Sequence, residues 1–229
     1  MLGVPFDCRL CMCDAVEEVV CGASRRAKGL LRCRRYYGVP DMVLLYKAQV
    51  LSYMEYRTPA ISHAADRHLD RLDAVQTRYL SELGVTSVAA LVDFNLAPLC
   101  VRRDIALLGV IHRAACGIGP KELQQFFVLE GGPPSQRSLR SSARRHRRHL
   151  AEPRGDWQDR LDSFSRSAFG LSHVYNLLPP EYVETDCVSD FQKGLQALVA
   201  KAWQKGEASW QKLLSPRWPR HCHPLKKFR

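Results

Sequence analysis

The sequence lacks the signatures of several large protein classes. No window approaches the roughly 18 uninterrupted apolar residues of a membrane span, and the opening residues MLGVPFDCRL lack the basic and apolar regions of a secretory signal. The GxSxG, HExxH and Walker A patterns of hydrolases, zinc proteases and P-loop NTPases are absent as well. We therefore expect an intracellular protein, nuclear or cytoplasmic and not secreted, that has no membrane partner.

The pattern of a zinc site is also incomplete. Cys8-x-x-Cys11 is the single CxxC pair among nine cysteines, whereas a structural zinc ion usually takes its ligands from two short paired motifs. Cys21 and Cys33 lie roughly 18 Å apart along a predicted helix, and the donors at 221–223 belong to a separate segment. We expect free thiols in a reducing compartment, and neither a metal nor a cofactor.

What the chain does contain is the composition of a globular protein with an excess of positive charge. Its 229 residues are 46% hydrophobic and 25% charged, and 34 Lys plus Arg against 23 Asp plus Glu give a net charge of +11. Arginine predominates, and its planar guanidinium suits phosphate oxygens. A basic domain is a first sign of nucleic-acid binding, although a solvated basic surface that aids solubility is the alternative.

Apolar periodicity predicts a mainly α fold. Apolar residues recur every three to four positions in several segments, and no strand-like alternation of useful length occurs. Asp14, with Glu17 three residues later, is the expected N-cap of the first helix. Pro59 limits the second helix, and Gly84 lies just beyond the third. The expected helices cover roughly residues 14–38, 40–57, 64–83, 88–93, 99–115, 121–127, 163–170 and 189–204.

The character of the chain changes at Gly131-Gly132-Pro133-Pro134. From there to about Asp159 it is poor in apolar residues and rich in Ser and Arg, which is typical of a flexible linker. We therefore expect a helical domain over residues 1–128 that begins with a short extended piece. A basic disordered linker over 129–159 and a smaller helical region over 160–229 are expected to follow.

One set of basic residues lies on the first predicted helix. Arg25, Lys28, Arg32 and Arg35 follow one another at steps of three, four and three, which places them on one face, opposite the apolar stripe. Such a row can track a phosphate backbone. It can also simply complement the negative end of the helix dipole.

A second basic set lies in the predicted linker. It is dense, it has no apolar face, and it meets almost no acidic residue before Glu152. Such a run is a non-specific polyanion contact, a nuclear-import-like patch or only a solvated linker; we favour nucleic-acid contact. Its arginines are Arg137, Arg140, Arg144, Arg145, Arg147 and Arg148.

Aromatic side chains can stack on bases, but at helical spacing they more often belong to the core. Tyr36 and Tyr37 adjoin Arg34-Arg35, and both interpretations stay open for them. His112 is expected to be packed or half-exposed rather than catalytic. The tyrosines expected in the core are Tyr53, Tyr56 and Tyr79.

The stretch Leu44–Leu83 contains a distinctive series of short motifs. They are Tyr46-Lys47, then Leu51-Ser52-Tyr53-Met54-Glu55-Tyr56 with Pro59, then Leu72 with Val75-Gln76-Thr77-Arg78. In this order they resemble the segment that follows the polymerase palm in reverse transcriptases of non-LTR (LINE-type) retrotransposons. Motifs at residues 2–7, 94–113, 175–180 and 223–225 are similar to neighbouring parts of the same proteins.

The resemblance implies a thumb-like helical bundle that grips the template–primer duplex, with Lys47, Arg57 and Arg78 as further candidates for nucleic-acid contact. A reverse transcriptase holds its catalytic metal ions with an adjacent Asp-Asp pair, and this sequence has none. Magnesium would therefore belong to the missing palm. We expect a catalytically silent chain, for which a palm-containing polypeptide is a candidate partner.

These observations support one leading hypothesis and two alternatives. The leading hypothesis is a fragment of a retrotransposon RNA-directed DNA polymerase that retains binding of RNA or DNA through phosphate contacts. The first alternative is a helical protein-interaction module whose basic patches are incidental. The second is an inert relic.

Overall fold

The computed structural model describes residues 3–130, 146–151, 169–219 and 222–228. Helices make up most of these residues, which confirms the prediction of a mainly α fold. Within the described ranges the only β interaction is an isolated bridge between Leu129 and Leu150. The fold divides into two compact units, residues 1–103 and 104–229, and the division falls inside helix α7 (Leu99–Ala115).

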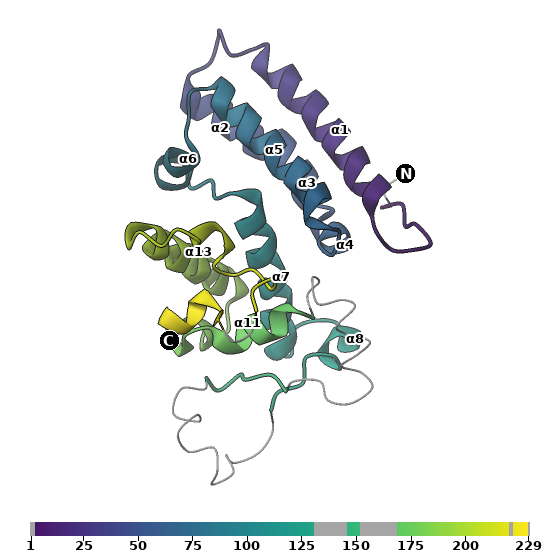
Figure 1. Cartoon of the computed structure of the whole chain (residues 1–229), viewed down its shortest axis with the longest axis vertical. Coiled ribbons are helices and arrows are strands. Elements are labelled where there is room, and N and C mark those ends of the chain that lie inside the picture. The colour runs from purple at the N-terminus through teal and green to yellow at the C-terminus, as the bar shows by residue number, and fades with distance from the viewer. Residues whose placement is uncertain (1–2, 131–145, 152–168, 220–221, 229) are drawn as a thin grey trace. The chain divides into compact units, whose positions relative to one another are not determined.

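The first unit consists of helices joined by short turns (Figure 1). Pro40 occupies the first turn of α2 and Pro59 that of α4, where a missing N–H costs nothing. Gly84, at φ 71°, follows the end of α5 as expected. The helices are α1 (Cys13–Leu31), α2 (Val39–Tyr46), the π-helical turn η1 (Lys47–Leu51), α3 (Ser52–Glu55), α4 (Thr58–Ile61), α5 (Asp66–Glu82) and α6 (Ser87–Phe94).

Three rods lie side by side in this unit: α1, α5, and the continuous run of α2, η1 and α3 (Figure 1). Two ion pairs fix the direction of α1 relative to α5. Glu17 and Arg71 pair near the start of both helices, with Arg71 Nη2 donating to Glu17 Oε1 at 2.9 Å. Arg34 and Glu82 pair at 2.9 Å near both ends. Helices α1 and α5 therefore run parallel. The third rod runs antiparallel to them, since Arg57, just after its end, pairs with Glu18 near the start of α1.

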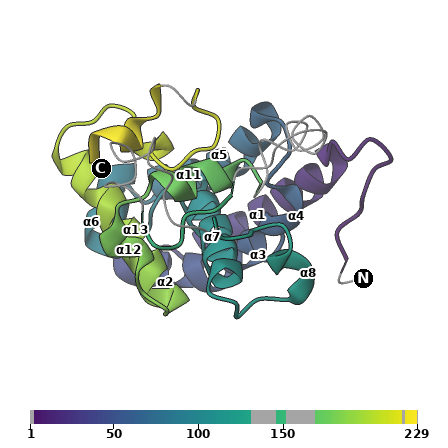
Figure 2. The ribbon, with the colours of Figure 1, turned by 90° about the horizontal axis from the view of Figure 1, so that it is seen from below.

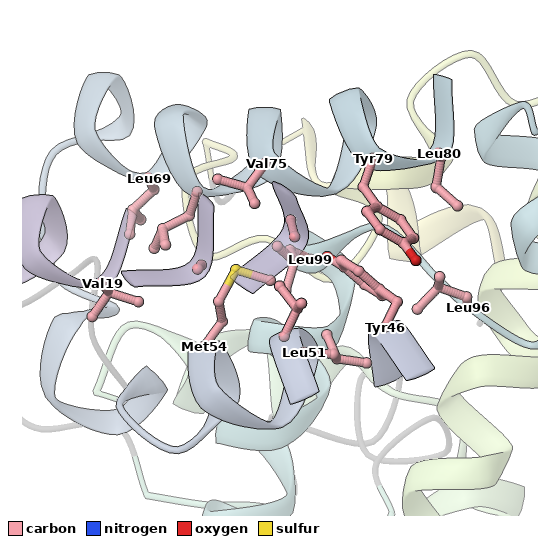
Figure 3. Close-up of a cluster of buried hydrophobic side chains, with 14 of the residues drawn as sticks. Val19, Tyr46, Leu51, Met54, Leu69, Val75, Tyr79, Leu80, Leu96 and Leu99 are labelled. Atoms are coloured by element: carbon pink, nitrogen blue, oxygen red, sulfur yellow. The ribbon is translucent and has the colours of Figure 1, made fainter. Parts of the chain in front are cut away.

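An apolar core fills the space between the rods (Figure 3). Each rod supplies residues at helical spacing, because side chains three and four positions apart share a face. Val19 comes from α1, Met54 from α3 and Leu69 from α5, and each is at most 4% exposed. Gly22 allows α1 to approach the third rod closely, since an added Cβ would lie 2.4 Å from the Tyr53 hydroxyl.

The core contains a stacked pair of tyrosines, and only one of their two hydroxyls has a hydrogen-bond partner among the described residues. The rings of Tyr46 and Tyr79 lie 4.7 Å apart (Figure 3). The Tyr79 hydroxyl donates to the carbonyl of Met42 at 2.9 Å, and burial raises the pKa of Tyr79 to about 12. The Tyr46 hydroxyl is buried and has no hydrogen-bond partner among the described residues.

We therefore expect Tyr79→Phe to lower the free energy of unfolding by about 1 kcal/mol, because it removes a buried hydrogen bond. Tyr46→Phe is expected to leave that free energy unchanged or to raise it by about 1 kcal/mol, because it removes an unsatisfied buried hydroxyl. Urea unfolding followed by circular dichroism measures both changes. A clear destabilisation by Tyr46→Phe would mean that the Tyr46 hydroxyl has a partner, such as a buried water.

The start of α1 differs from the predicted capping box. The helix begins at Cys13, and Met12, with φ 57°, precedes it, so that Asp14 lies inside the first turn. The carboxylate of Asp7 instead accepts the backbone N–H groups of Arg9 and Cys11 at 3.0 Å and of Met12 at 2.6 Å. The hydrogen bond from the Cys11 amide is the main factor that lowers the pKa of Asp7.

The second unit continues along α7 into one further long helix, α13, and several short ones. Helix α12 lies beside α13 (Figure 2). The long helix expected at 189–204 corresponds to α13, whereas most of the one expected at 163–170 lies outside the described residues. The helices are α8 (Lys121–Gln124), α11 (Leu171–Leu177), α12 (Pro180–Val183), α13 (Val188–Gln204) and the 3-10 turns η3 (Trp210–Lys212) and η5 (Pro224–Phe228).

Residues 146–151, which fall in the predicted linker, are held by hydrogen bonds in this unit. The Asn176 side chain accepts from the backbone N–H of Leu150 at 2.8 Å and donates to its carbonyl at 2.9 Å. On the other side, the amide of Glu130 donates to the His149 carbonyl at 2.8 Å. The interpretation of 129–159 as a single disordered linker is therefore corrected at these residues, and the expected boundary at 128 lies inside the second unit.

The core of the second unit contains a fully buried histidine on α7. The ring of His112 stacks on Phe191 at a centroid distance of 4.0 Å. Its Nε2 lies 2.9 Å from the Thr185 carbonyl, and its Nδ1 lies 2.9 Å from the Tyr175 hydroxyl. Because a carbonyl only accepts, Nε2 carries the proton, and Nδ1 accepts from Tyr175. His112 is thus packed, as expected, and both of its ring nitrogens have hydrogen-bond partners.

None of the described helices is long and apolar enough to span a lipid bilayer.

Candidate nucleic-acid interface

The outer face of α1 carries a row of positive charge along its C-terminal half. Arg25, Lys28 and Arg32 are exposed and lie opposite the buried face of the helix; we call these three residues the α1 stripe. At 1.5 Å per residue the row extends over roughly 10 Å. Cys21, also exposed, lies on the same face one turn before Arg25.

The charges of the α1 stripe have no partner among the residues that the structure describes. Within the described part of the chain, its three side chains form no ion pair and no side-chain hydrogen bond. The neighbouring cations are engaged: the Arg26 guanidinium lies 4.3 Å from the centre of the Tyr53 ring, and Arg34 pairs with Glu82. Between Val19 and Pro40 the sequence holds six Lys or Arg and no Asp or Glu, so no acidic residue adjoins the stripe along the chain.

The prediction that four cations share one helix face is wrong for Arg35, which lies beyond the end of α1. Helix α1 ends at Leu31, not near residue 38, because the next residues have no core to pack against and are all exposed. Tight turns follow, in which Cys33 N donates to the Leu30 carbonyl at 2.8 Å. Arg32 is at the helix C-cap, and Arg35 is exposed in the turn before α2.

The division of the tyrosines between core and surface differs from the prediction. Tyr79 belongs to the core as expected, and Tyr53 is half-buried beneath Arg26. Tyr56, which was also expected in the core, is 68% exposed, because it follows the last turn of α3 on its outer side. Tyr36 and Tyr37, for which both interpretations were open, are 83% and 52% exposed in the turn after α1.

Lys47 is half-buried and Arg57 buried, and both side chains have partners within the first unit. Lys47 Nζ donates to the Phe94 carbonyl at 2.5 Å, and burial lowers the pKa of Lys47. The Arg57 guanidinium is buried and pairs with Glu18 at 2.9 Å. The resemblance-based expectation for these two residues is therefore corrected, since each is engaged within the first unit.

Arg78 is a better candidate than either of these. It is exposed on α5, on the side away from the core residues Val75 and Tyr79. Within the described ranges it has no ion pair or hydrogen bond from its side chain. It thus remains available for contact with an anion.

The arginine-rich run is only partly described. Arg147 is exposed. Arg148 instead donates to the carbonyls of Val183 at 2.5 Å and Thr185 at 2.6 Å and pairs with Asp186. Its expected role in nucleic-acid contact is therefore corrected to a structural one. The members that lie outside the described residues are Arg137, Arg140, Arg144 and Arg145.

Cysteines and histidines approach one another at the start of α1. Cys13 Sγ lies 3.2 Å from His68 Nε2, which also accepts from Arg67 Nε at 3.0 Å. His63 Nε2 lies 2.9 Å from the Leu10 carbonyl. In the described portion of the chain, no group of three or more His, Cys, Asp or Glu side chains is arranged to hold a metal ion.

Sequence reasoning did not anticipate which cations are free. The partner of Arg34 is 48 residues away and that of Arg57 is 39 residues away, and no local pattern indicates either pair. The absence of acidic residues between Val19 and Pro40 is the one sequence signal that marks the α1 stripe.

No family model matches this chain, and neither a curated protein nor a solved structure is similar to it.

Proposed function

We propose that the first unit binds RNA or DNA through contacts between backbone phosphates and the α1 stripe, with Arg35 and Arg78 as additional contacts. The observation that carries the proposal is the row of exposed cations that have no partner among the described residues. Guanidinium groups donate to phosphate oxygens in a fixed fork, which makes arginine suited to this ligand. Such contacts bind without regard to sequence.

The resemblance to the thumb of non-LTR reverse transcriptases indicates which nucleic acid the unit would grip. In that family the region holds the template–primer duplex behind the active site. In our proposal this chain retains the grip without the polymerase reaction, because its sequence has no adjacent Asp pair to hold the metal ions. The chain would then be a catalytically silent relative of an RNA-directed DNA polymerase.

Binding to three labelled ligands tests the proposal: single-stranded RNA, an RNA–DNA hybrid and duplex DNA of equal length. Each phosphate contact releases a counterion, so affinity falls steeply as salt rises. For three to five contacts we expect binding to weaken roughly 100-fold between about 50 and 200 mM salt. Negligible affinity at the lower salt concentration, or affinity that does not change with salt, would contradict the proposal.

A protein-interaction module is the second candidate function. It is favoured by exposed apolar side chains in the second unit, where Ile118 is 62% and Val128 56% exposed. Apolar association strengthens or persists as salt rises. The same salt series therefore separates this function from phosphate binding.

A further inference from the structure

The turn between α1 and α2 presents two adjacent aromatic rings to solvent. Tyr36 is 83% and Tyr37 52% exposed, and tyrosine is an amphipathic side chain enriched at binding interfaces. The turn is nevertheless ordered: Tyr36 N donates to the Cys33 carbonyl at 2.9 Å, and Arg34 ties the turn to Glu82 at the end of α5. The backbone that carries the two rings is thus hydrogen-bonded within the turn.

Positively charged residues precede these rings along the chain. Arg35 precedes Tyr36 directly, and the α1 stripe ends at Arg32, three residues before Arg35. The nearest acidic residue along the chain after the turn is Asp41. An aromatic platform beside a row of cations is the combination that single-strand sites use, since phosphates follow the cations while bases stack on the rings.

We propose that Tyr36 and Tyr37 form a stacking site for unpaired bases, so that the first unit prefers a single strand, or the single-stranded end of a duplex, over a blunt duplex. This inference rests on the proposed function, because the α1 stripe supplies the phosphate contacts. It specifies the ligand further, as a polynucleotide with unpaired, exposed bases. A protein partner fits less well, because cations precede the two tyrosines along the chain and Val39, the next apolar residue after them, is only 36% exposed.

The test compares three labelled ligands of equal phosphate number: a 12-nucleotide oligothymidylate, a chain of the same length made of abasic units, and a blunt duplex. Stacking contributes to affinity with bases but not with abasic units. We expect the intact protein to bind the oligothymidylate roughly 5- to 100-fold more tightly than the abasic chain. Equal affinity for the two chains would overturn the inference while leaving phosphate binding intact.

Two variants identify the residues. The double variant Tyr36→Ala, Tyr37→Ala is expected to lose the preference for bases and to keep its affinity for the abasic chain and its salt dependence. The variant Tyr36→Phe, Tyr37→Phe is expected to retain the preference, because the rings remain. Tyr56→Ala is the matched control, since Tyr56 is 68% exposed but lies after α3.

Each outcome is decisive. A preference that survives in the double alanine variant, or that Tyr56→Ala abolishes equally, overturns the assignment to the turn. Failure of the intact protein to bind any of the three ligands at low salt overturns the proposed function itself. Unchanged thermal unfolding of the double alanine variant is expected, because both side chains are exposed.

Discussion

Replacing His112 with alanine is expected to lower the free energy of unfolding of the second unit by about 3–4 kcal/mol. His112 is fully buried and stacks on Phe191, so truncation opens a cavity among rings that cannot easily close it. The Tyr175 hydroxyl also loses its acceptor, and an unsatisfied buried hydroxyl adds to the cost. Tryptophan fluorescence during urea unfolding measures the change, because all four tryptophans follow residue 104.

The same histidine makes stability depend on pH. Burial lowers the pKa of His112, which outweighs the opposing effect of its hydrogen bond to the Thr185 carbonyl. The unfolded chain therefore takes up a proton at higher pH than the folded one does. Stability is fully present above the unfolded pKa of about 6.5 and is lost as pH falls below it towards the lower folded pKa.

His112→Gln is the matched control for this pH dependence. Glutamine can donate and accept hydrogen bonds but does not titrate. We expect the variant to lose less stability than alanine does and to show a smaller fall in stability below pH about 6.5. Some fall remains, because burial also lowers the pKa of His223. An unchanged pH profile would mean that His112 is accessible to protons in the folded state.

Removal of four positive charges is expected to have the largest effect on binding. The variant Arg25→Ala, Lys28→Ala, Arg32→Ala, Arg35→Ala deletes the α1 stripe and the cation of the following turn. If all four contact phosphates, the slope of log affinity against log salt falls by roughly 3 to 4. This corresponds to roughly 1,000-fold weaker binding at about 0.1 M salt.

A second variant removes the same amount of charge elsewhere. Lys193, Lys201, Lys205 and Lys212 are exposed in the second unit, and their replacement by alanine lowers the net charge equally. We expect this control to change the slope by less than about 1. If both variants weaken binding alike, total charge rather than the α1 stripe determines affinity.

Strong apolar periodicity made the long helices predictable from sequence. Helix α7 has the predicted bounds, and α13 begins one residue earlier than predicted. The end of α1 was not predictable in this way, because α1 stops where the core ends, and the core is made by distant residues. The start of α1 was missed for a similar reason: Asp7, six residues upstream of Cys13, binds the free amides before the helix.

The sequence predicted where the cations of the candidate site lie, but not which cations are free to contact a ligand. Spacing placed Arg25, Lys28 and Arg32 on one face, and the structure has them there. Spacing could not indicate that Lys47 binds the Phe94 carbonyl or that Arg57 pairs with Glu18, because tertiary packing brings these groups together. Whether a cation is free depends on the three-dimensional neighbourhood, which a local pattern does not contain.

The central claim is that nucleic acid lies along the outer face of α1, and an exposed cysteine on that face tests it most directly. Cys21 shares the face of the α1 stripe, whereas Cys187 is exposed in the second unit. The measurement is the rate at which each thiol of the intact protein is alkylated, with and without saturating single-stranded RNA. We predict that RNA slows alkylation of Cys21 and leaves Cys187 unchanged; an unchanged rate at Cys21 while RNA is bound would contradict the account.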